Sequence, residues 1–366
     1  MTSDSNYFGK RNRLLALLLC IAISVGVAIA QSAPTGCPSI HPAGTVSGAD
    51  TTIQCGGCLW LHADVTATAT TANDYTVSAI QYNPPFSYTA GTPINLNQDD
   101  YYAAIINLPF AFCFYGQTYR QACVGANGVV SFNAGNNGQY CAYSYSSYVP
   151  IPNANFPSSL LNAIYGVCED IWPGHSTGGG SIYQGVLGTY PCRTACISYY
   201  QCPLYGNYST HNTSQIVLYE GTNIIDVYIH ERNCCSSTNS GYGLVGVQNA
   251  TGTQAVAAPN RNGGTWTTSY EAWRFTPTGT PNYVVTWYDG TDTSASGVVL
   301  GHDTIHSDTA VSRIYVCPRG VNAFTARLRY TACNGDHFDI INTTTITSSD
   351  VTYKDTSFCH SGPYVF

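Results

Sequence analysis

One short stretch in the middle of the chain holds the residue types best suited to chemistry. Residues 167–180 read VCEDIWPGHSTGGG, which brings Glu169, Asp170 and His175 close together in the sequence. Carboxylates and an imidazole can bind a metal ion, and calcium is the ion that most favours carboxylate oxygens. These three residues are therefore the candidate metal ligands.

The calcium hypothesis has a limit and an alternative. Calcium takes about six to eight oxygen ligands, whereas this stretch supplies only two carboxylates. Asp99 and Asp100 could join them in space. Alternatively, Glu169 and Asp170 only accept hydrogen bonds from turn amides, while Trp172 covers the end of a sheet. We therefore expect no cofactor, with a structural calcium ion as the alternative.

Catalytic chemistry fits the stretch poorly. Adjacent residues of a strand point to opposite faces, so Glu169 and Asp170 cannot converge on one glycosidic bond. The glycines at 178–180 are followed by neither the lysine nor the helix of a phosphate-binding loop. No Gly-x-Ser-x-Gly nucleophile motif occurs. We expect a protein that is not an enzyme.

A tyrosine-rich stretch is the second candidate site. Residues 139–150 read QYCAYSYSSYVP. Tyrosines among small polar residues give rigid contact area with adaptable hydrogen bonds, as in recognition loops. The candidate ligand-binding residues are Tyr140, Tyr143, Tyr145, Tyr148 and Trp172. The alternative is a stretch that packs on its own sheet.

The elements that would position these residues are strands. Charged residues make up 9% of the chain, with 29 Tyr and 35 Gly, a mixture typical of strands and tight turns. In the run NIIDVYIHE (223–231), Ile225, Val227 and Ile229 would share one apolar face, with a mixed face opposite. We predict an all-β fold. The net charge of −7, with no basic stripe, argues against a nucleic-acid partner.

The first thirty residues resemble a secretory signal. Lys10, Arg11 and Arg13 precede the apolar stretch 14–30, which ends in the small-x-small pattern Ala-Ile-Ala. We expect cleavage there, a secreted or cell-surface protein, and no transmembrane span afterwards. An uncleaved anchor is the alternative.

The cysteines fit an oxidising compartment. Sixteen occur, and removing Cys20 with the signal leaves an odd number, so at least one thiol is free or pairs with another chain. Local pairs are Cys55 with Cys58, Cys192 with Cys196 or Cys202, and Cys317 with Cys333, and zinc at 55–62 is a competitor. The vicinal Cys234 and Cys235 predict two separate disulfides over a strained ring or redox switch. The disulfide candidates are Cys55, Cys58, Cys113, Cys123, Cys192, Cys196, Cys202, Cys234, Cys235, Cys317 and Cys333.

Composition shifts divide the chain. The linker TPTGTP (276–281) separates two β-rich parts, and the second is expected to hold Trp287 in its core. The expected parts are a signal peptide (1–30), a loosely structured, Cys-containing lead-in (31–73), a main domain (74–278), a smaller β-sandwich (281–342) and a weakly patterned tail (343–366).

Six segments occur in an order that resembles the extracellular nidogen-like (NIDO) domain. They are LPFAFCFYGQTY (108–119), GANGVVSF (125–132), NAIYGVCEDIW…GGGSIYQG (162–185), QIVLYEGTNIIDVYIHE (215–231), YGLVGVQNATG (242–252) and EAWRFTP (271–277). More specifically, the segments resemble the version at the N-terminus of large secreted Bacteroidetes surface or gliding-associated proteins, where Ig-like or PKD-like modules follow.

This resemblance implies a nidogen-like β-sandwich-type domain, then a smaller Ig-like β-sandwich. It implies adhesion to a matrix or partner surface, through an extracellular protein or glycan ligand, without catalysis. In the family pattern, the strand at 163–167 would exit at Glu169 and Asp170 and return through a hairpin at 181–183. The alternatives are a carbohydrate-active enzyme or lectin acting on extracellular glycans, and a structural spacer of a surface array.

Overall fold

The computed structural model describes most of the chain after the predicted signal. The described residues are 37–44, 51–54, 57–68, 72–235, 237–279, 281–331, 333, 335–349, 352–353 and 356–357, and all belong to one compact unit, 33–366. The predicted signal peptide and Cys55 lie outside the described residues.

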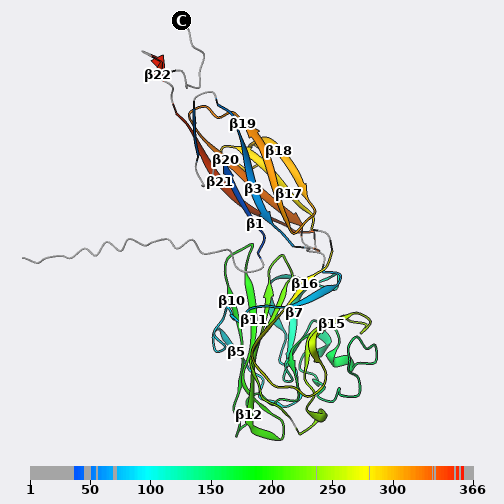
Figure 1. Ribbon diagram of the computed structural model, residues 1–366. Helices are drawn as coiled ribbons and strands as arrows, with labels where there is room; N and C mark the ends of the chain where they lie inside the picture. Colours follow the sequence, from blue (N-terminus) through cyan, green and yellow to red (C-terminus); the bar gives the residue numbers. More distant parts are fainter. Residues whose placement is uncertain are drawn as a thin grey trace, which may run out of the picture. The chain divides into compact units, whose positions relative to one another are not determined.

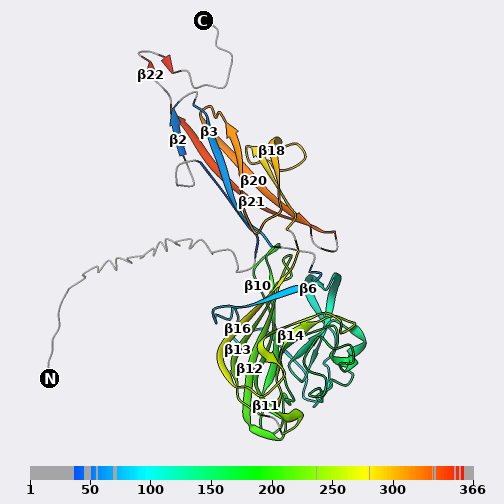
Figure 2. The same cartoon turned by 45° about the vertical axis from the view of Figure 1, so that its right-hand side comes forward.

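The fold is all-β, as the sequence predicts, and its strands enclose two separate cores. Seven antiparallel strands form one sheet of the first core, in the order β4 (Tyr75–Ala79), β16 (Thr268–Pro277), β13 (Ile225–Arg232), β12 (Asn207–Tyr219), β11 (Thr194–Leu204), β10 (Ser181–Leu187) and β5 (Thr92–Ile94). Six strands form the facing sheet, in the order β15 (Ala255–Asn262), β14 (Leu244–Gln248), β9 (Ala163–Cys168), β8 (Val129–Ser131), β7 (Gln117–Gly125) and β6 (Ile106–Phe114). Figure 2 shows β16, β13, β12 and β11 running side by side.

The apolar faces of the two sheets meet in this first core. Ile225, Val227 and Ile229 of β13 are all fully buried in it, which confirms the predicted apolar face. Val124 and Ile164 of the six-stranded sheet belong to the same cluster. Burial of such side chains is the main stabilising contribution to a sandwich of this kind.

The second core combines strands that precede the first core in the sequence with strands that follow it. A three-stranded sheet has the order β1 (Ser39–Gly44), β3 (Leu59–Thr66) and β19 (Thr309–Val316). A five-stranded sheet has the order β18 (Val298–Ile305), β17 (Tyr283–Asp289), β20 (Val321–Thr331), β21 (His337–Ser349) and β2 (Thr51–Gln54). Trp287 lies buried in this core, as predicted. Beyond it, β22 (Thr352–Tyr353) pairs with β23 (Thr356–Ser357).

The expected lead-in therefore differs from the structure. Figure 1 shows β1 and β3 (blue) beside β19 (orange), and Figure 2 shows β2 beside β21. Strand β3 reads LWLHADVT, and its alternate residues Leu59, Leu61, Ala63 and Val65 are buried in the second core. Residues 343–349, assigned to the weakly patterned tail, are likewise the second half of β21. An Ig-like character of this core stays a prediction.

The described helices are three short 3₁₀ turns. They are η1 (Ala134–Asn136), η2 (Ser158–Leu160) and η3 (Asn239–Gly241). None of the helices in the described ranges is therefore long enough to cross a bilayer, which requires about 20 residues.

The disulfides confirm an oxidised framework, but the suggested local pairs are wrong. Cys58 bonds to Cys317, and the two residues occupy the next paired position beyond Leu59 and Val316 at the end of the β3–β19 ladder. The other bonds among described residues are Cys37–Cys192, Cys113–Cys333 and Cys234–Cys235. The vicinal cysteines thus bond to each other, contrary to the prediction of separate bridges. Because Cys58 is bonded to Cys317, its thiolate cannot serve the zinc site considered at 55–62.

Three further disulfide candidates are buried thiols. Cys123, Cys196 and Cys202 are unbonded, as are Cys141 and Cys168. Burial raises the pKa of Cys202 to about 12 and that of Cys196 to about 11. These thiols are therefore protonated and unreactive at neutral pH.

We predict that Leu61→Ala destabilises the second core. Leu61 is fully buried on β3, so the truncation removes apolar contacts and leaves a cavity, at a cost of about 2–5 kcal/mol in the free energy of unfolding. Asp64→Ala on the exposed face of the same strand is the control, with a change within about 0.5 kcal/mol. Urea unfolding measures both, and equal effects would mean that β3 does not belong to this core.

Candidate binding site

The stretch 167–180 carries the chain from one sheet to the other. Strand β9 ends at Cys168, and β10 begins at Ser181, close to the predicted strand positions. The two strands do not form the expected hairpin, because β9 pairs with β8 and β14, whereas β10 pairs with β11 and β5. Ile171 forms an isolated bridge with Leu204 at the crossing. The chemistry-bearing residues therefore lie at one end of the sandwich, between its sheets.

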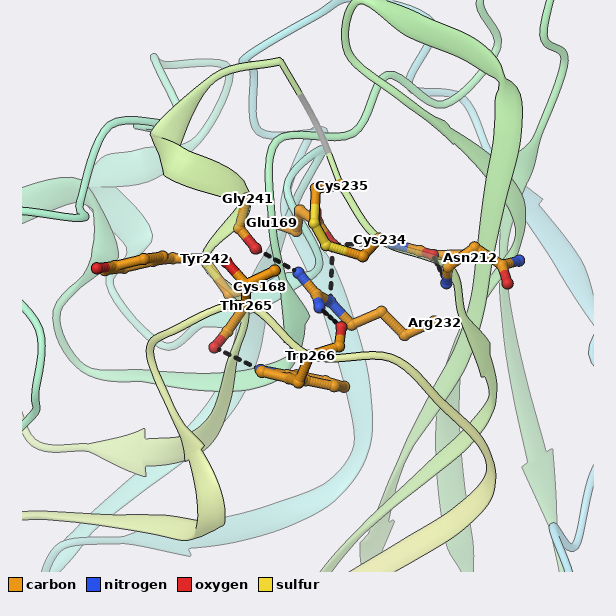
Figure 3. A network of polar contacts seen from close by, with 12 residues as sticks. Cys168, Glu169, Asn212, Arg232, Cys234, Cys235, Gly241, Tyr242, Thr265 and Trp266 are labelled. Atoms are coloured by element: carbon orange, nitrogen blue, oxygen red, sulfur yellow. Dashed lines mark hydrogen bonds and ion pairs between the residues drawn. A yellow bond between two sulfur atoms is a disulfide. The ribbon is translucent and has the colours of Figure 1, made fainter.

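Glu169 makes a buried ion pair with Arg232 (Figure 3). Arg232 Nε donates to Glu169 Oε2 at 2.9 Å, and both side chains are fully buried. Asn212 Nδ2 donates to the same carboxylate oxygen at 3.0 Å. Because Arg232 ends β13 and Glu169 follows β9, the pair joins strands of the two facing sheets.

The other two guanidinium nitrogens of Arg232 also donate hydrogen bonds. Its Nη2 donates to the carbonyl of Gly241 at 3.0 Å, and its Nη1 donates to the carbonyl of Trp266. Figure 3 shows the guanidinium beside the Trp266 ring. The guanidinium carbon lies 4.1 Å from the ring centre, within cation–π range. A Cβ on Gly243 would lie 2.7 Å from guanidinium atoms, so the close packing here requires glycine. Glu169 therefore has a structural role.

Asp170, in contrast, joins a group of acidic side chains. One carboxylate oxygen each of Asp99, Asp100 and Asp170 lies within 4.8 Å of the others, and this is the one such group of potential metal ligands among the described residues. We call it the Asp cluster. Asp170 Oδ2 accepts a hydrogen bond from Thr238 Oγ1, and Asp100 Oδ1 accepts one from Asn127 Nδ2 at 3.0 Å.

Proximity and burial raise the pKa values within the Asp cluster. Burial and the neighbouring charge of Asp100 raise the pKa of Asp99 to about 6. Burial raises the pKa of Asp170 to about 7, and the charges of Asp100, Asp99 and Glu169 act in the same direction. The hydrogen bond from Thr238 lowers it only in part. Carboxylates in this arrangement are destabilised in their charged form.

His175 lies in an aromatic cluster. Its ring stacks on that of Tyr208, with 3.7 Å between the ring centres, and meets the Trp172 ring edge-on, with 4.5 Å between the centres. The Trp172 ring in turn stacks on Tyr205, with 6.4 Å between the ring centres. Its Nδ1 accepts hydrogen bonds from the backbone amides of Thr177 and Gly178, at 3.2 and 3.3 Å. We call Trp172, His175, Tyr205 and Tyr208 the Trp172 cluster. Of the three candidate metal ligands, only Asp170 belongs to the Asp cluster.

The Trp172 cluster adjoins the Asp cluster. The Tyr205 amide donates to the Asp170 carbonyl at 3.0 Å, and Trp172 Nε1 donates to the carbonyl of Asn97 at 3.2 Å. All four members of the aromatic cluster are half-buried. They therefore offer ring surface to solvent from positions that their neighbours fix.

The tyrosine-rich stretch divides between core and surface. Tyr145 is fully buried, and its hydroxyl donates to the carbonyls of Cys168 and Tyr242. Tyr140 and Tyr148 are exposed, at 49% and 38%, and Tyr143 is half-buried. Among the described ring contacts, none joins two of these four tyrosines, so they do not form one aromatic surface. Tyr145 serves packing, as the alternative interpretation held.

Sequence reasoning missed Tyr205 and Tyr208. They flank the turn between β11 and β12, where Gly206 adopts a φ of 73°. The sequence Tyr-Gly-Asn between two β-rich runs is typical of a turn, and this pattern would have predicted that both rings lie near a loop. Their proximity to Trp172 depends on the crossing between sheets, and no local pattern predicts it.

We predict that Glu169→Gln is strongly destabilising. The variant leaves the Arg232 charge buried without its counter-ion, which costs about 3–5 kcal/mol. The control is Asp339→Asn, which breaks the partly exposed pair with Arg329 and costs about 1 kcal/mol or less. Urea unfolding compares the two. Equal losses would contradict the structural role of the buried pair.

Comparison with known proteins agrees with this architecture. A family model described as NIDO related matches residues 74–289, more than half of the chain, from just before β4 to the end of β17. No curated protein and no solved structure matches the chain. The match and the disulfides fit an extracellular module of the adhesion type. The chain belongs to the NIDO-related family.

Proposed function

We propose that this protein is a secreted or cell-surface binding module that acts in adhesion to a matrix or partner surface, without catalysis. The family membership carries this proposal. The Trp172 cluster supplies the contact surface. The finer resemblance, to modules that begin Bacteroidetes surface proteins and precede Ig-like modules, is part of the proposal and stays a prediction.

The Trp172 cluster has the properties of a recognition surface. Aromatic side chains are enriched where binding energy concentrates, because they bury large areas and lose little conformational freedom. Here, Trp172 and His175 come from the crossing between the sheets, Tyr205 comes from the β11–β12 turn, and Tyr208 comes from the start of β12. Stacking and the Trp172–Asn97 hydrogen bond hold the rings in place before any ligand arrives.

The disposition of the reactive groups favours binding over turnover. Glu169 is engaged by Arg232 in a fully buried ion pair, so its carboxylate is not available for acid–base chemistry. The described free thiols are buried. Aromatic rings beside carboxylates also suit a glycan ligand, so a lectin or carbohydrate-active enzyme is the second candidate.

We predict that the full-length chain binds reproducibly, at micromolar affinity or tighter, to an element of a combined array of matrix proteins and glycans. A protein hit supports adhesion to matrix, and a glycan hit without hydrolysis supports a lectin. Hydrolysis of a glycan would overturn the non-catalytic proposal. A blank array would favour a structural spacer.

We further predict that Tyr208→Ala weakens binding to the array hit about tenfold or more, because it removes a central ring of the Trp172 cluster. The matched control is Tyr315→Ala, which removes a 56% exposed tyrosine from β19 and should leave the affinity unchanged. Surface plasmon resonance measures both affinities. If Tyr208→Ala binds like the wild type, the ligand uses another surface.

A further inference from the structure

We propose that Asp99, Asp100 and Asp170 bind a calcium ion at the crossing between the two sheets. This composition differs from the ligand set expected from the sequence, because Glu169 and His175 are replaced by two aspartates from a distant loop. The site does not depend on the proposed adhesive function, and it is tested without any adhesion partner.

The geometry gathers three carboxylates from two separate segments. Asp99 and Asp100 lie in the loop between β5 and β6, and Asp170 lies just beyond β9. One oxygen from each lies within 4.8 Å of the other two, so a single ion could contact all three. Oxygens that share a cation are expected at about this separation, because calcium–oxygen distances are about 2.3–2.6 Å.

Unpaired buried oxygens point independently to a ligand at the Asp cluster. Asp170 is 2% exposed, yet its Oδ1 is buried with no hydrogen-bond partner in the structure. Asp99 Oδ1 is also buried and unpartnered. Leaving a buried carboxylate oxygen unpaired is costly, and native proteins rarely tolerate it without a hydrogen bond or an ion.

Among the described residues, no cationic side chain forms an ion pair with the Asp cluster. In the part of the chain that the structure describes, none of the six ion pairs includes Asp99, Asp100 or Asp170. Three carboxylates in close contact repel one another, so a divalent cation would stabilise the folded state by direct attraction.

The ligand chemistry selects calcium. All three side chains offer hard carboxylate oxygens, and the group contains neither the thiolate nor the imidazole that zinc prefers. Three carboxylates provide up to six oxygens, within the range of about six to eight that calcium takes. Magnesium requires near-octahedral geometry and retains its water more strongly, so the irregular loop suits it less.

Hydrogen bonds from neighbouring residues hold the Asp cluster in position, and these bonds are compatible with a bound calcium ion. Asn127 connects the two segments, because its Nδ2 donates to Asp100 Oδ1 and its Oδ1 accepts from the Ile171 amide at 3.2 Å. The Asp170 carbonyl accepts the Tyr205 amide. The ion would therefore fasten the loop at 97–102 to the end of β9, next to the Trp172 cluster.

The test is calorimetry on the full-length protein with calcium chloride as the probe. We expect a binding heat at millimolar calcium or below. We also expect an unfolding temperature higher by about 5 °C or more in calcium at a hundredfold excess over its Kd than in EDTA. Absence of both effects overturns the proposal. An equal shift with magnesium overturns the assignment to calcium.

Two variants locate the ion. Asp99→Asn and Asp170→Asn keep the side-chain shape but remove one charge, so each should weaken calcium binding at least tenfold. In EDTA, their unfolding temperatures should equal or exceed that of the wild type, because repulsion in the empty cluster is relieved. Asp308→Asn, at an exposed aspartate elsewhere, is the control and keeps the full calcium shift. If both cluster variants bind calcium as tightly as the wild type, the ion binds elsewhere and the proposed site is wrong. Asp99 is half-exposed, so Asp99→Asn remains informative even if Asp170→Asn fails to fold.

Discussion

The buried ion pair of Glu169 and Arg232 holds the two sheets of the first core together at the end where the chain crosses between them. A charge pair with no exposure is costly to desolvate unless further hydrogen bonds compensate for the lost water. Each nitrogen of the Arg232 guanidinium donates a hydrogen bond, to Glu169 or to the carbonyls of Gly241 and Trp266, and the group also lies over the Trp266 ring. The crossing segment that carries Asp170, Trp172 and His175 begins directly after Glu169, so the ion pair fixes where that segment leaves the sheet.

The few charged residues of this sequence are used largely in ion pairs. Several of the arginines are bound to a carboxylate partner, as in the pairs Arg193–Glu220, Arg261–Glu271, Arg274–Asp226 and Arg329–Asp339. Charge is used here mainly as pairs that fix strands to one another. Against this pattern, three aspartates gathered without a cation are an exception, and an exception of this kind indicates a binding function better than acidic residues in general do.

The sequence was most informative where the cause is local. The alternation of Ile225, Val227 and Ile229 and the burial of Trp287 follow from strand periodicity, and both are confirmed. Partners distant in sequence were not predictable. The pairing of β3 with β19, the bond from Cys58 to Cys317, and the approach of Asp99 to Asp170 all depend on chain paths that no local pattern encodes.

The interleaving of the second core constrains how the chain can fold as it is synthesised. Strand β3 can pair early only with β1, because its other partner, β19, follows the whole family domain in the chain, as does β21, the partner of β2. At about 5–20 residues per second, the wait is on the order of tens of seconds. Throughout it, Leu59, Leu61 and Val65 have no core to enter. We therefore expect the second core to close after the first, with the apolar faces of the N-terminal strands exposed to aggregation or chaperone capture until then.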